Sequence, residues 1–395
     1  MKVGYNYSYH ASRRNIIGQV DDVDYVRVYD INNMLNYFEK ISRKLTGHSL
    51  YDPHNQRFSF NDLNLNKVDI LHFFNTISFS RTPWISSFET VIPRYQSILS
   101  CHHGRNCGYS ELTQDRRILK AIAALYSGSC RKIIALSKCN LNMQKDFLQH
   151  FPDFSTEIEN KLIQMHPPQE ILTDKRHDKR ISRNEKIHFM FVGRAFFRKG
   201  GMEILEAFQD AKKNAFCNLQ LTIISNLARD DAAAGETERD EKSARDIIHR
   251  NSDWIAHYNY LPNRDVLELM KTAHVGLLPT YADTYGYTVL EFQACGCPVI
   301  STNIRALPEI NSNEMGWLIE IPQNRLGEAL FTTQEDRNKI RLIIKEKLRS
   351  IIAEIMEYRE SIAQKSLLAQ QHIKDEHSPE QYSRRLGQIY RDALL

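Results

Sequence analysis

Long apolar runs are missing from this chain of 395 residues. Apolar stretches such as 118–124, which Lys120 interrupts, fall well short of the ~20 residues that a bilayer-spanning helix needs. The first residues, MKVGYNYSYHASRR, lack the apolar core of a signal peptide and resemble a first strand instead. The sequence therefore predicts no membrane span and a cytoplasmic protein.

A strong charge of either sign is also missing. Lys and Arg number 52 against 48 for Asp and Glu, a formal net charge of +4, and no nucleic-acid recognition motif accompanies this small excess. We therefore expect no nucleic-acid partner. The mild basic excess suits small anions or an anionic membrane surface, so a peripheral contact with the inner membrane face is one expectation. The basic residues of the first half that suit such a contact are Arg13, Arg14, Arg116, Arg117, Arg131 and Lys132.

Paired cysteines and metal-ligand spacings are a third absence. The seven cysteines are an odd number in scattered positions, which predicts reduced thiols. Cys295-Gly-Cys297 and Cys101-His102-His103 both lack a second ligand pair at the usual distance for zinc. We therefore expect no metal and no other cofactor. The remaining cysteines are Cys107, Cys130, Cys139 and Cys217.

What the chain does contain is a hydrophobic fraction of 42% and two successive alternations of strands and helices, which predict two α/β domains with parallel sheets. The polar segment 167–186 is the best linker, and we expect one domain from 1–176 with 378–395 and another from 177–377. The charged segment 229–245 reads as a solvated excursion. The expected strands are 2–7, 25–28, 68–74, 132–136, 187–192, 219–224 and 275–278, and the expected helices are 137–150, 202–213, 244–250, 265–272, 334–373 and 381–394.

A first chemical cluster follows the buried strand that ends at Gly193-Arg194. Lys199 stands five residues further on, before two glycines and an amphipathic helix. Ligands of open α/β sheets lie beyond the carboxyl ends of strands, and a helix N-terminus attracts anions. This arrangement predicts a phosphate-binding loop, although basic loop residues are also commonly just solvated. The spacing fits neither a Walker loop nor a GxGxxG fingerprint.

A second cluster, from Asp283 to Glu291, joins a strand end to a helix through Gly286. If the helix begins near Tyr287, its first amides point toward the same ligand as Arg194, and Glu291 lies one turn inside. A carboxylate there can accept hydrogen bonds from vicinal hydroxyls such as those of ribose. The alternative is that Glu291 only caps its own helix and Asp283 is a solvated loop residue.

The motifs Asp283-x-Tyr-Gly-x-x-x-Leu-Glu291, Ala294-x-Gly-x-Pro-Val-Ile and Pro308-Glu309-Ile310 resemble the acidic-x7-Glu signature of the retaining glycosyltransferase family 4, glycosyl transferases group 1. Phe191-Val-Gly-Arg194 with Lys199-Gly200 resembles the phosphate-binding segment of that family. The resemblance covers 187–311 in order and spacing. It implies an α/β fold of the GT-B type, with two Rossmann-like domains facing each other across a cleft and a C-terminal helix that crosses back to the first domain.

The resemblance also implies roles for individual residues. Arg194 and Lys199 would neutralise the donor diphosphate, Glu291 would hold the ribose, and Asp283 would hold the donor sugar. Asn259 stands where the family usually has glycine, and asparagine tolerates the same left-handed backbone. The expected donor-binding residues besides these catalytic four are Gly193, Asn259, Tyr260, Leu261, Tyr285, Gly286, Tyr287 and Thr288.

The first half resembles the family less, because the glycine-rich acceptor-side loop after the first strand is missing. Glu89 occupies the point where relatives commonly place a histidine, and His102 and His103 are alternatives, with a surface or structural role as the other reading. The resemblance implies retaining transfer of a hexosyl group from a UDP- or GDP-sugar to a hydroxyl of a glycan or lipid-linked acceptor in surface polysaccharide synthesis. A sugar-nucleotide-binding scaffold or inactive subunit, and a GT-B sugar-nucleotide epimerase or hydrolase, are the alternatives.

Overall fold

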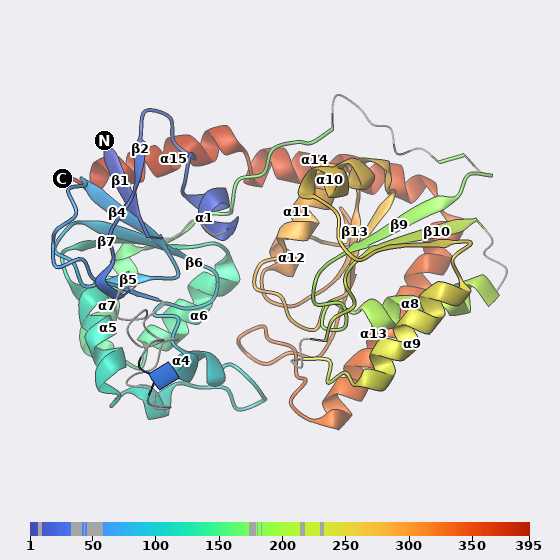
Figure 1. Cartoon of the computed structure of the whole chain (residues 1–395), viewed down its shortest axis with the longest axis horizontal. Coiled ribbons are helices and arrows are strands. Elements are labelled where there is room, and N and C mark those ends of the chain that lie inside the picture. Colours follow the sequence, from blue (N-terminus) through green and yellow to red (C-terminus); the bar gives the residue numbers. More distant parts are fainter. Residues whose placement is uncertain are drawn as a thin grey trace. The chain divides into compact units, whose positions relative to one another are not determined.

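The computed structural model describes residues 1–6, 10–32, 42, 44–45, 58–173, 179, 181–182, 184–213, 218–229 and 233–395. The described chain forms two α/β units (Figure 1). Unit 1 comprises Met1–His103, Cys107–Pro168 and Ser378–Leu395, and unit 2 comprises Gly104–Asn106 and Gln169–His377. The expected domain boundary at 176/177, the strand end at Tyr7 and Cys217 lie outside the described residues.

Unit 1 is built on a six-stranded parallel sheet in the order β2-β1-β4-β6-β7-β8. Every residue of β4 and of β6 is buried, as expected for strands that helices cover on both faces. The strands are β1 Lys2–Tyr5, β2 Asp24–Arg27, β4 Ile70–Phe74, β6 Trp84–Phe88, β7 Cys130–Ala135 and β8 Leu162–Gln164, with a separate pair β3 Ser59–Phe60 and β5 Ile77–Ser78. The helices are α1 His10–Asn15, α4 Gln96–Ser100, η1 Ser110–Leu112, α5 Arg116–Tyr126, α6 Lys138–Leu148 and α7 Pro152–Lys161.

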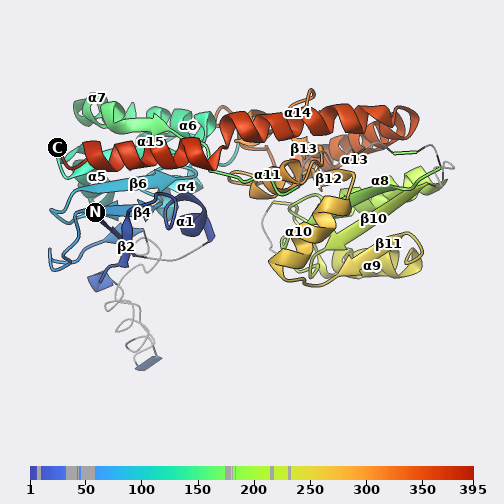
Figure 2. The same ribbon diagram turned by 90° about the horizontal axis from the view of Figure 1, so that it is seen from above.

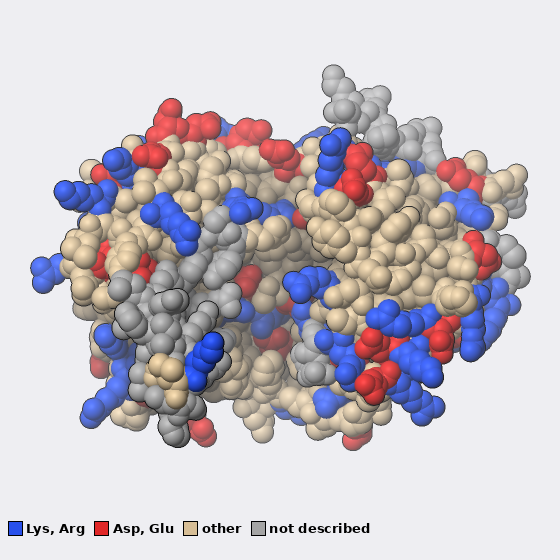
Figure 3. Space-filling view, in the orientation of Figure 1, with Lys and Arg blue, Asp and Glu red and all other residues tan. Residues whose placement is uncertain are grey.

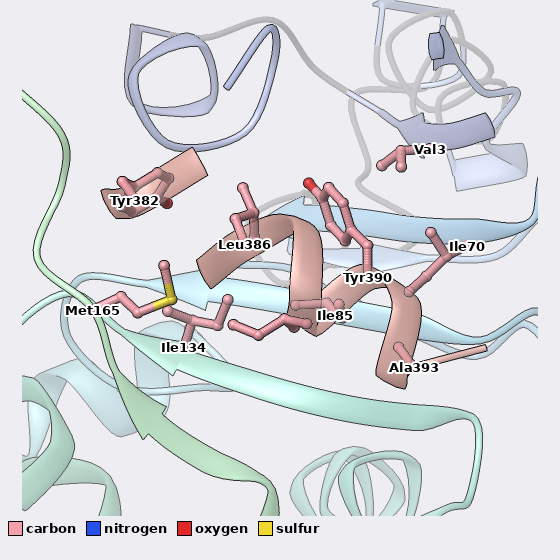
Figure 4. Packing of buried hydrophobic residues seen from close by; sticks show 10 residues of the cluster. Val3, Ile70, Ile85, Ile134, Met165, Tyr382, Leu386, Tyr390 and Ala393 are labelled. Atoms are coloured by element: carbon pink, nitrogen blue, oxygen red, sulfur yellow. The ribbon is translucent and has the colours of Figure 1, made fainter. Parts of the chain in front are cut away.

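The last helix, α15 Pro379–Asp392, completes the core of unit 1, as the C-terminal return predicts. Its residues Tyr382, Leu386 and Tyr390 pack against apolar side chains of β1, β4, β6 and β7 (Figure 4). His72 of β4 lies between two hydroxyls, 2.8 Å from Tyr390 Oη and 2.9 Å from Ser87 Oγ. The helix is therefore fixed to the sheet by directional bonds as well as by apolar contact.

Unit 2 repeats the design with the strand order β11-β10-β9-β12-β13-β14, again parallel throughout. The chain winds outward from β9 to β11, returns, and continues on the other side from β12, so the topological switch point lies between β9 and β12. The strands are β9 Ile187–Val192, β10 Leu219–Ile224, β11 Ile255–Tyr258, β12 Val275–Leu278, β13 Val299–Thr302 and β14 Trp317–Ile319. The helices are α8 Gly201–Lys213, α9 Glu238–Arg250, α10 Asn263–Thr272, α11 Tyr287–Ala294, α12 Leu307–Ile310, α13 Gln334–Glu357 and α14 Glu360–Glu376 (Figure 2).

Two expectations about the helices of unit 2 are wrong. The segment 334–373 is not one helix, because Tyr358 leaves the helical conformation and separates α13 from α14. Arg359 Nη1 donates to the carbonyl oxygens of Ser182 and Glu185, at 3.0 and 2.7 Å, and these tertiary bonds fix the break. The apolar stripe itself is confirmed as core-facing, since Ile340, Ile344, Leu348 and Ile352 are all fully buried.

The segment 229–245 is also only partly an excursion, because α9 begins at Glu238. Thr237 caps this helix: its Oγ1 accepts from the Asp240 amide, and the Asp240 carboxylate accepts from the Thr237 amide at 2.8 Å. A capping box can hold a charged sequence in a helix whose apolar face is narrow. Both signs of charge are interspersed over the face where α8, α9 and α13 lie (Figure 3).

None of the described helices combines the length and the apolar character that a bilayer-spanning segment requires.

Candidate functional site

The candidate site lies at the carboxyl edge of the unit 2 sheet, where the loops after β9 and β12 meet at the switch point. The β9–α8 loop runs from Gly193 to Gly200, and the β12–α11 loop runs from Pro279 to Gly286. Because β9 and β12 are hydrogen-bonded neighbours, their loops leave the same edge side by side. This brings together the two clusters that the sequence separates by some 80 positions.

Glycines permit the close approach of these loops. Gly200 has a φ of +80°, and a Cβ there would lie 2.2 Å from the carbonyl oxygen of Pro279. A Cβ on Gly193 would lie 2.5 Å from Cδ of Lys199, so the lysine side chain runs across the space that this glycine leaves open. Gly200 therefore has to be glycine, because of its positive φ and its contact with backbone, whereas a side chain at Gly193 would displace Lys199 from its present course.

Hydrogen bonds then fix the two loops to each other. The Tyr281 amide donates to the carbonyl oxygen of Arg198 at 2.9 Å. The Thr280 hydroxyl donates to the same oxygen at 3.1 Å, and Arg198 Nη1 donates to the carbonyl of Ala282 at 2.6 Å. Lys199 and Asp283, the next residues on the two loops, are held in register as a result.

The predicted basic and acidic clusters touch directly. Lys199 Nζ lies 3.4 Å from Asp283 Oδ2, and the two side chains are only 16% and 14% exposed. Asp283 Oδ1 accepts from the amides of Gly286 at 3.1 Å and Tyr285 at 3.3 Å. The carboxylate that the sequence assigns to a donor sugar thus also anchors Lys199 and the approach to α11.

The α11 helix begins at Tyr287, as expected, after Gly286 at a φ of +97°. A Cβ on Gly286 would lie 2.5 Å from Cδ2 of Leu307, so the position needs glycine for space as well as for conformation. Glu291 lies one turn inside the helix and is half-buried. The first turn, with Tyr287 and Thr288, carries the partial positive charge of the helix end toward the β12–α11 loop.

The other donor-side positions differ in exposure. Arg194 is exposed directly after β9, whereas Tyr285 is buried, with its ring centroid 5.3 Å from that of Tyr287. Asn259 and Tyr260 are exposed and Leu261 is half-buried, all just beyond the carboxyl end of β11. The predicted donor-side residues outside α11 therefore lie in the loops that follow β9, β11 and β12.

The expectation of a left-handed backbone at Asn259 is wrong. Asn259 does not occur among the described residues with positive φ. The chain passes from β11 through Leu261 to Pro262 and α10, and Pro262 itself is extended, with a φ of −56° and a ψ of 146°. The chain bends at Asn259 without entering the left-handed region.

The residues predicted for the acceptor side lie in unit 1. Glu89 follows β6 at the carboxyl edge of that sheet, with Arg94 Nη1 and Asn75 Nδ2 each 3.4 Å from its Oε1. His102 is buried, and the Tyr109 hydroxyl lies 2.9 Å from its Nε2, whereas His103 is exposed. Of these three residues, Glu89 directly follows a strand at the carboxyl edge of the sheet, which is where open parallel sheets bind ligands.

Sequence reasoning missed Arg198, Thr280 and Tyr281, which join the loops, and Glu203, which accepts a hydrogen bond from Tyr281. One signal for Glu203 was available, because it is an acidic residue on the apolar face of the helix after Lys199. Among the described residues, no group of three or more His, Cys, Asp or Glu side chains is arranged to hold a metal ion.

Comparisons with known proteins find similar sequences and similar folds. Residues 173–349 match the family model described as glycosyl transferases group 1. O-antigen chain mannosyltransferase B of Escherichia coli is 33% identical over 57 residues, which are 14% of this chain and only 15% of that protein.

Two solved structures cover nearly the whole chain. WaaG, a glycosyltransferase involved in lipopolysaccharide biosynthesis, has a TM-score of 0.57 at 14% identity, over 98% of this chain and 99% of that one. Anabaena Alr3699/HepE in complex with UDP-glucose has a TM-score of 0.56 at 11% identity, over 99% and 100%. The fold is therefore GT-B-like, with two six-stranded parallel sheets and a C-terminal helix that joins the first unit.

Proposed function

We propose that the protein transfers a hexosyl group from a nucleotide-sugar to a hydroxyl of an acceptor, with retention of the anomeric configuration. The match of residues 173–349 to the glycosyl transferases group 1 family supports this proposal. The observation that carries the proposal is the 3.4 Å contact between Lys199 and Asp283 at the switch point of the unit 2 sheet. Open parallel sheets bind ligands at that edge. At this edge the segment that resembles the acidic motif of the family, with Asp283, contacts the segment that resembles its phosphate-binding loop, with Lys199.

Arg194 and Lys199 neutralise the donor diphosphate in this proposal. The N-terminus of α11 adds the partial positive charge of a helix end, which suits phosphate. Asp283 holds the lysine in place until the donor arrives and then faces the donor sugar. Glu291 accepts hydrogen bonds from the ribose, and Asn259, Tyr260 and Leu261 line the nucleobase.

The central barrier of the reaction is the charge that develops on the departing nucleoside diphosphate. Fixed positive groups lower this barrier because they are oriented before the charge appears, and this contribution is usually the largest one in such sites. We propose that the leaving phosphate also takes the proton of the incoming acceptor hydroxyl on the same face of the sugar. Proton NMR of the product tests this: retention of the anomeric configuration is expected, and inversion contradicts it.

The donor and acceptor are proposed from relatives. The structure of Anabaena Alr3699/HepE contains UDP-glucose, which favours a UDP-sugar over a GDP-sugar. The matched segment of the E. coli O-antigen mannosyltransferase favours a glycan or lipid-linked acceptor in surface polysaccharide synthesis. Cys295 and Cys297 carry free thiols, which suits the reducing cytoplasm. We propose that the protein acts there, in peripheral contact with the inner membrane face.

Thermal unfolding against a panel of nucleotide-sugars tests the donor site directly. A ligand that binds the folded state stabilises it by about 2.7 kcal/mol when present at 100 times its Kd, so the right donor raises the Tm. Turnover of that donor with and without a glycan acceptor then separates transfer from hydrolysis or epimerisation. A panel in which no nucleotide-sugar raises the Tm contradicts the proposal, and binding without any turnover identifies a scaffold.

A further inference from the structure

A buried hydrogen bond lies behind the candidate donor loops. The Tyr281 hydroxyl donates to Glu203 Oε1 at 2.8 Å, and the two residues are only 2% and 3% exposed. Glu203 lies in the first turn of α8, four residues after Lys199, and Tyr281 lies two residues before Asp283. The bond therefore joins the bases of the two loops whose tips form the Lys199–Asp283 contact.

We propose that Glu203 is a positioning residue, which holds the β12–α11 loop in the conformation that presents Asp283 to Lys199 and to the donor. The inference rests on the proposed function, since it assigns a role to a residue that touches neither donor nor acceptor. Tyr281 is held from two sides: its amide donates to the carbonyl of Arg198, and its hydroxyl donates to Glu203. Loss of the hydroxyl bond leaves Tyr281 with its backbone bond alone, so its side chain no longer fixes the loop to α8.

Packing alone does not account for a carboxyl group at this position. The neighbours of Glu203 on α8, Met202, Ile204 and Leu205, are apolar and buried. Moving a carboxylate out of water costs several kcal/mol, which an apolar side chain in the same place avoids. A directional acceptor for the Tyr281 hydroxyl is what the carboxyl group adds there.

The Glu203 carboxyl group also borders a cavity. It lines a cavity of about 210 Å³ between α8, the start of α9 and the first turns of α13. Its Oε2 has no hydrogen-bond partner among the described residues. Arg341 Nε of α13 lies 3.9 Å from Oε1. Titratable and charged groups from four elements face Glu203. They are Glu206 on its own helix, Arg337 and Arg341 on α13, Tyr281 in the β12–α11 loop, and Glu236 and Asp240 at the start of α9.

Burial raises the pKa of Glu203 to about 7. A hydrogen bond to a carboxylate is roughly twice as strong as one to a neutral acceptor, so the ionised form holds Tyr281 more firmly than the protonated form. The loop is consequently held best above pH 7 and is loosened, though not released, below it. We expect kcat/KM for the donor to fall by about threefold as the pH drops from 8 to 6, because only the charge-assisted part of the bond is lost.

Four variants test the role. Glu203→Gln keeps a neutral acceptor, so it is expected to match the wild type at pH 6, to lag about threefold at pH 8, and to lack the acid limb. Glu203→Ala and Tyr281→Phe lose the bond, and kcat/KM for the donor is expected to fall about tenfold at both pH values. Glu206→Gln is the matched control, since Glu206 also binds Arg341, whereas the Tyr281 hydroxyl donates to Glu203, and wild-type kinetics are expected at pH 8, where Glu203 stays ionised.

Hydrogen exchange in the ligand-free proteins gives a second readout, which does not depend on the reaction. Amides of 280–286 are expected to exchange at least ~10-fold faster in Glu203→Ala and Tyr281→Phe than in the wild type, and to be unchanged in Glu206→Gln. If the wild type turns over no donor and the amides still exchange faster in Glu203→Ala and Tyr281→Phe, the proposed function is wrong but the positioning role holds. Unchanged exchange in Tyr281→Phe, or a pH profile of Glu203→Gln identical to that of the wild type, overturns the positioning role.

Discussion

Lys199 Nζ lies 3.4 Å from Asp283 Oδ2, although 84 positions separate the two residues in the chain. The contact pairs the point charge of a lysine with a carboxylate that is itself bound by the amides of Tyr285 and Gly286. A lysine restrained in this way has lost much of its side-chain entropy before a ligand arrives. A diphosphate that reaches the loop therefore meets a cation that is already in position.

Replacement of Lys199 by alanine is expected to lower turnover of the nucleotide-sugar by at least ~100-fold, because it removes a fixed charge from the leaving group. Lys213→Ala is the matched control, since Lys213 lies at the far end of α8 and is 77% exposed. Initial rates at saturating donor measure the effect. Similar rates in the two variants contradict the assignment of Lys199.

Glu291→Gln is expected to weaken binding of the nucleotide by ~10-fold or more, since an amide replaces a charged acceptor for the ribose hydroxyls. Titration calorimetry with UDP measures the change. The exposed Glu268→Gln on α10 serves as control and is expected to bind like the wild type. A deoxyribose form of the nucleotide, which lacks a hydroxyl, is expected to show a smaller difference between wild type and Glu291→Gln. An equal difference for both nucleotides argues against a ribose contact.

Gly200→Ala is expected to destabilise the protein by at least ~2 kcal/mol, because alanine strains a φ of +80° and its Cβ collides with the Pro279 carbonyl. Gly128→Ala provides the comparison, since a Cβ at Gly128 meets nothing within 4 Å. The midpoint of urea unfolding measures both. Equal midpoints for the two variants show that the loops do not approach each other as closely as described.

His72 makes the protein sensitive to acid. Burial lowers the pKa of His72 to about 3, whereas the unfolded chain takes up this proton near pH 6.5. The stability that the neutral imidazole contributes is thus present above pH 6.5 and is lost as the pH falls toward 3, by up to about 5 kcal/mol. Urea unfolding between pH 7.5 and 4.5 should show a steeper decline for wild type than for His72→Gln. Parallel declines contradict this prediction.

Glu203 acts in the opposite direction on stability. Its pKa of about 7 lies above the value for an unfolded glutamate, so the folded state holds a proton that the unfolded state releases. This stability is complete below about pH 4.5 and is lost as the pH rises through 7, by up to about 3 kcal/mol. Glu203→Gln should therefore gain stability relative to the wild type between pH 5 and 8. A constant difference across that range refutes the raised pKa.

The sequence predicted the strands of unit 2 best where short segments rich in apolar residues are clearly bounded. The segments 187–192, 219–224 and 275–278 coincide with β9, β10 and β12, because strands buried on both faces are predominantly apolar. The start of α11 at Tyr287 was predicted equally well, since a glycine precedes it. Local chemistry determines all of these features.

What the sequence could not predict depends on distant partners. The break between α13 and α14 is fixed by Arg359, whose acceptors Ser182 and Glu185 lie some 175 positions earlier. The bond between Glu203 and Tyr281 spans 78 positions and neither residue belongs to a family motif. Sequence patterns contain no sign of such pairings until the fold brings the partners together.

Unit 1 combines segments from both ends of the chain, and this affects when its core can be completed during synthesis. Translation delivers the strands carrying Val3, Ile70, Ile85 and Ile134 first, whereas the α15 residues that cover them follow only after the roughly 200 residues of unit 2. At ~5–20 residues per second, the ribosome needs roughly 10–40 s to synthesise that interval. During this time the apolar sheet face that α15 later covers is exposed in the nascent first unit. Chaperones bind exposed apolar surface of this kind.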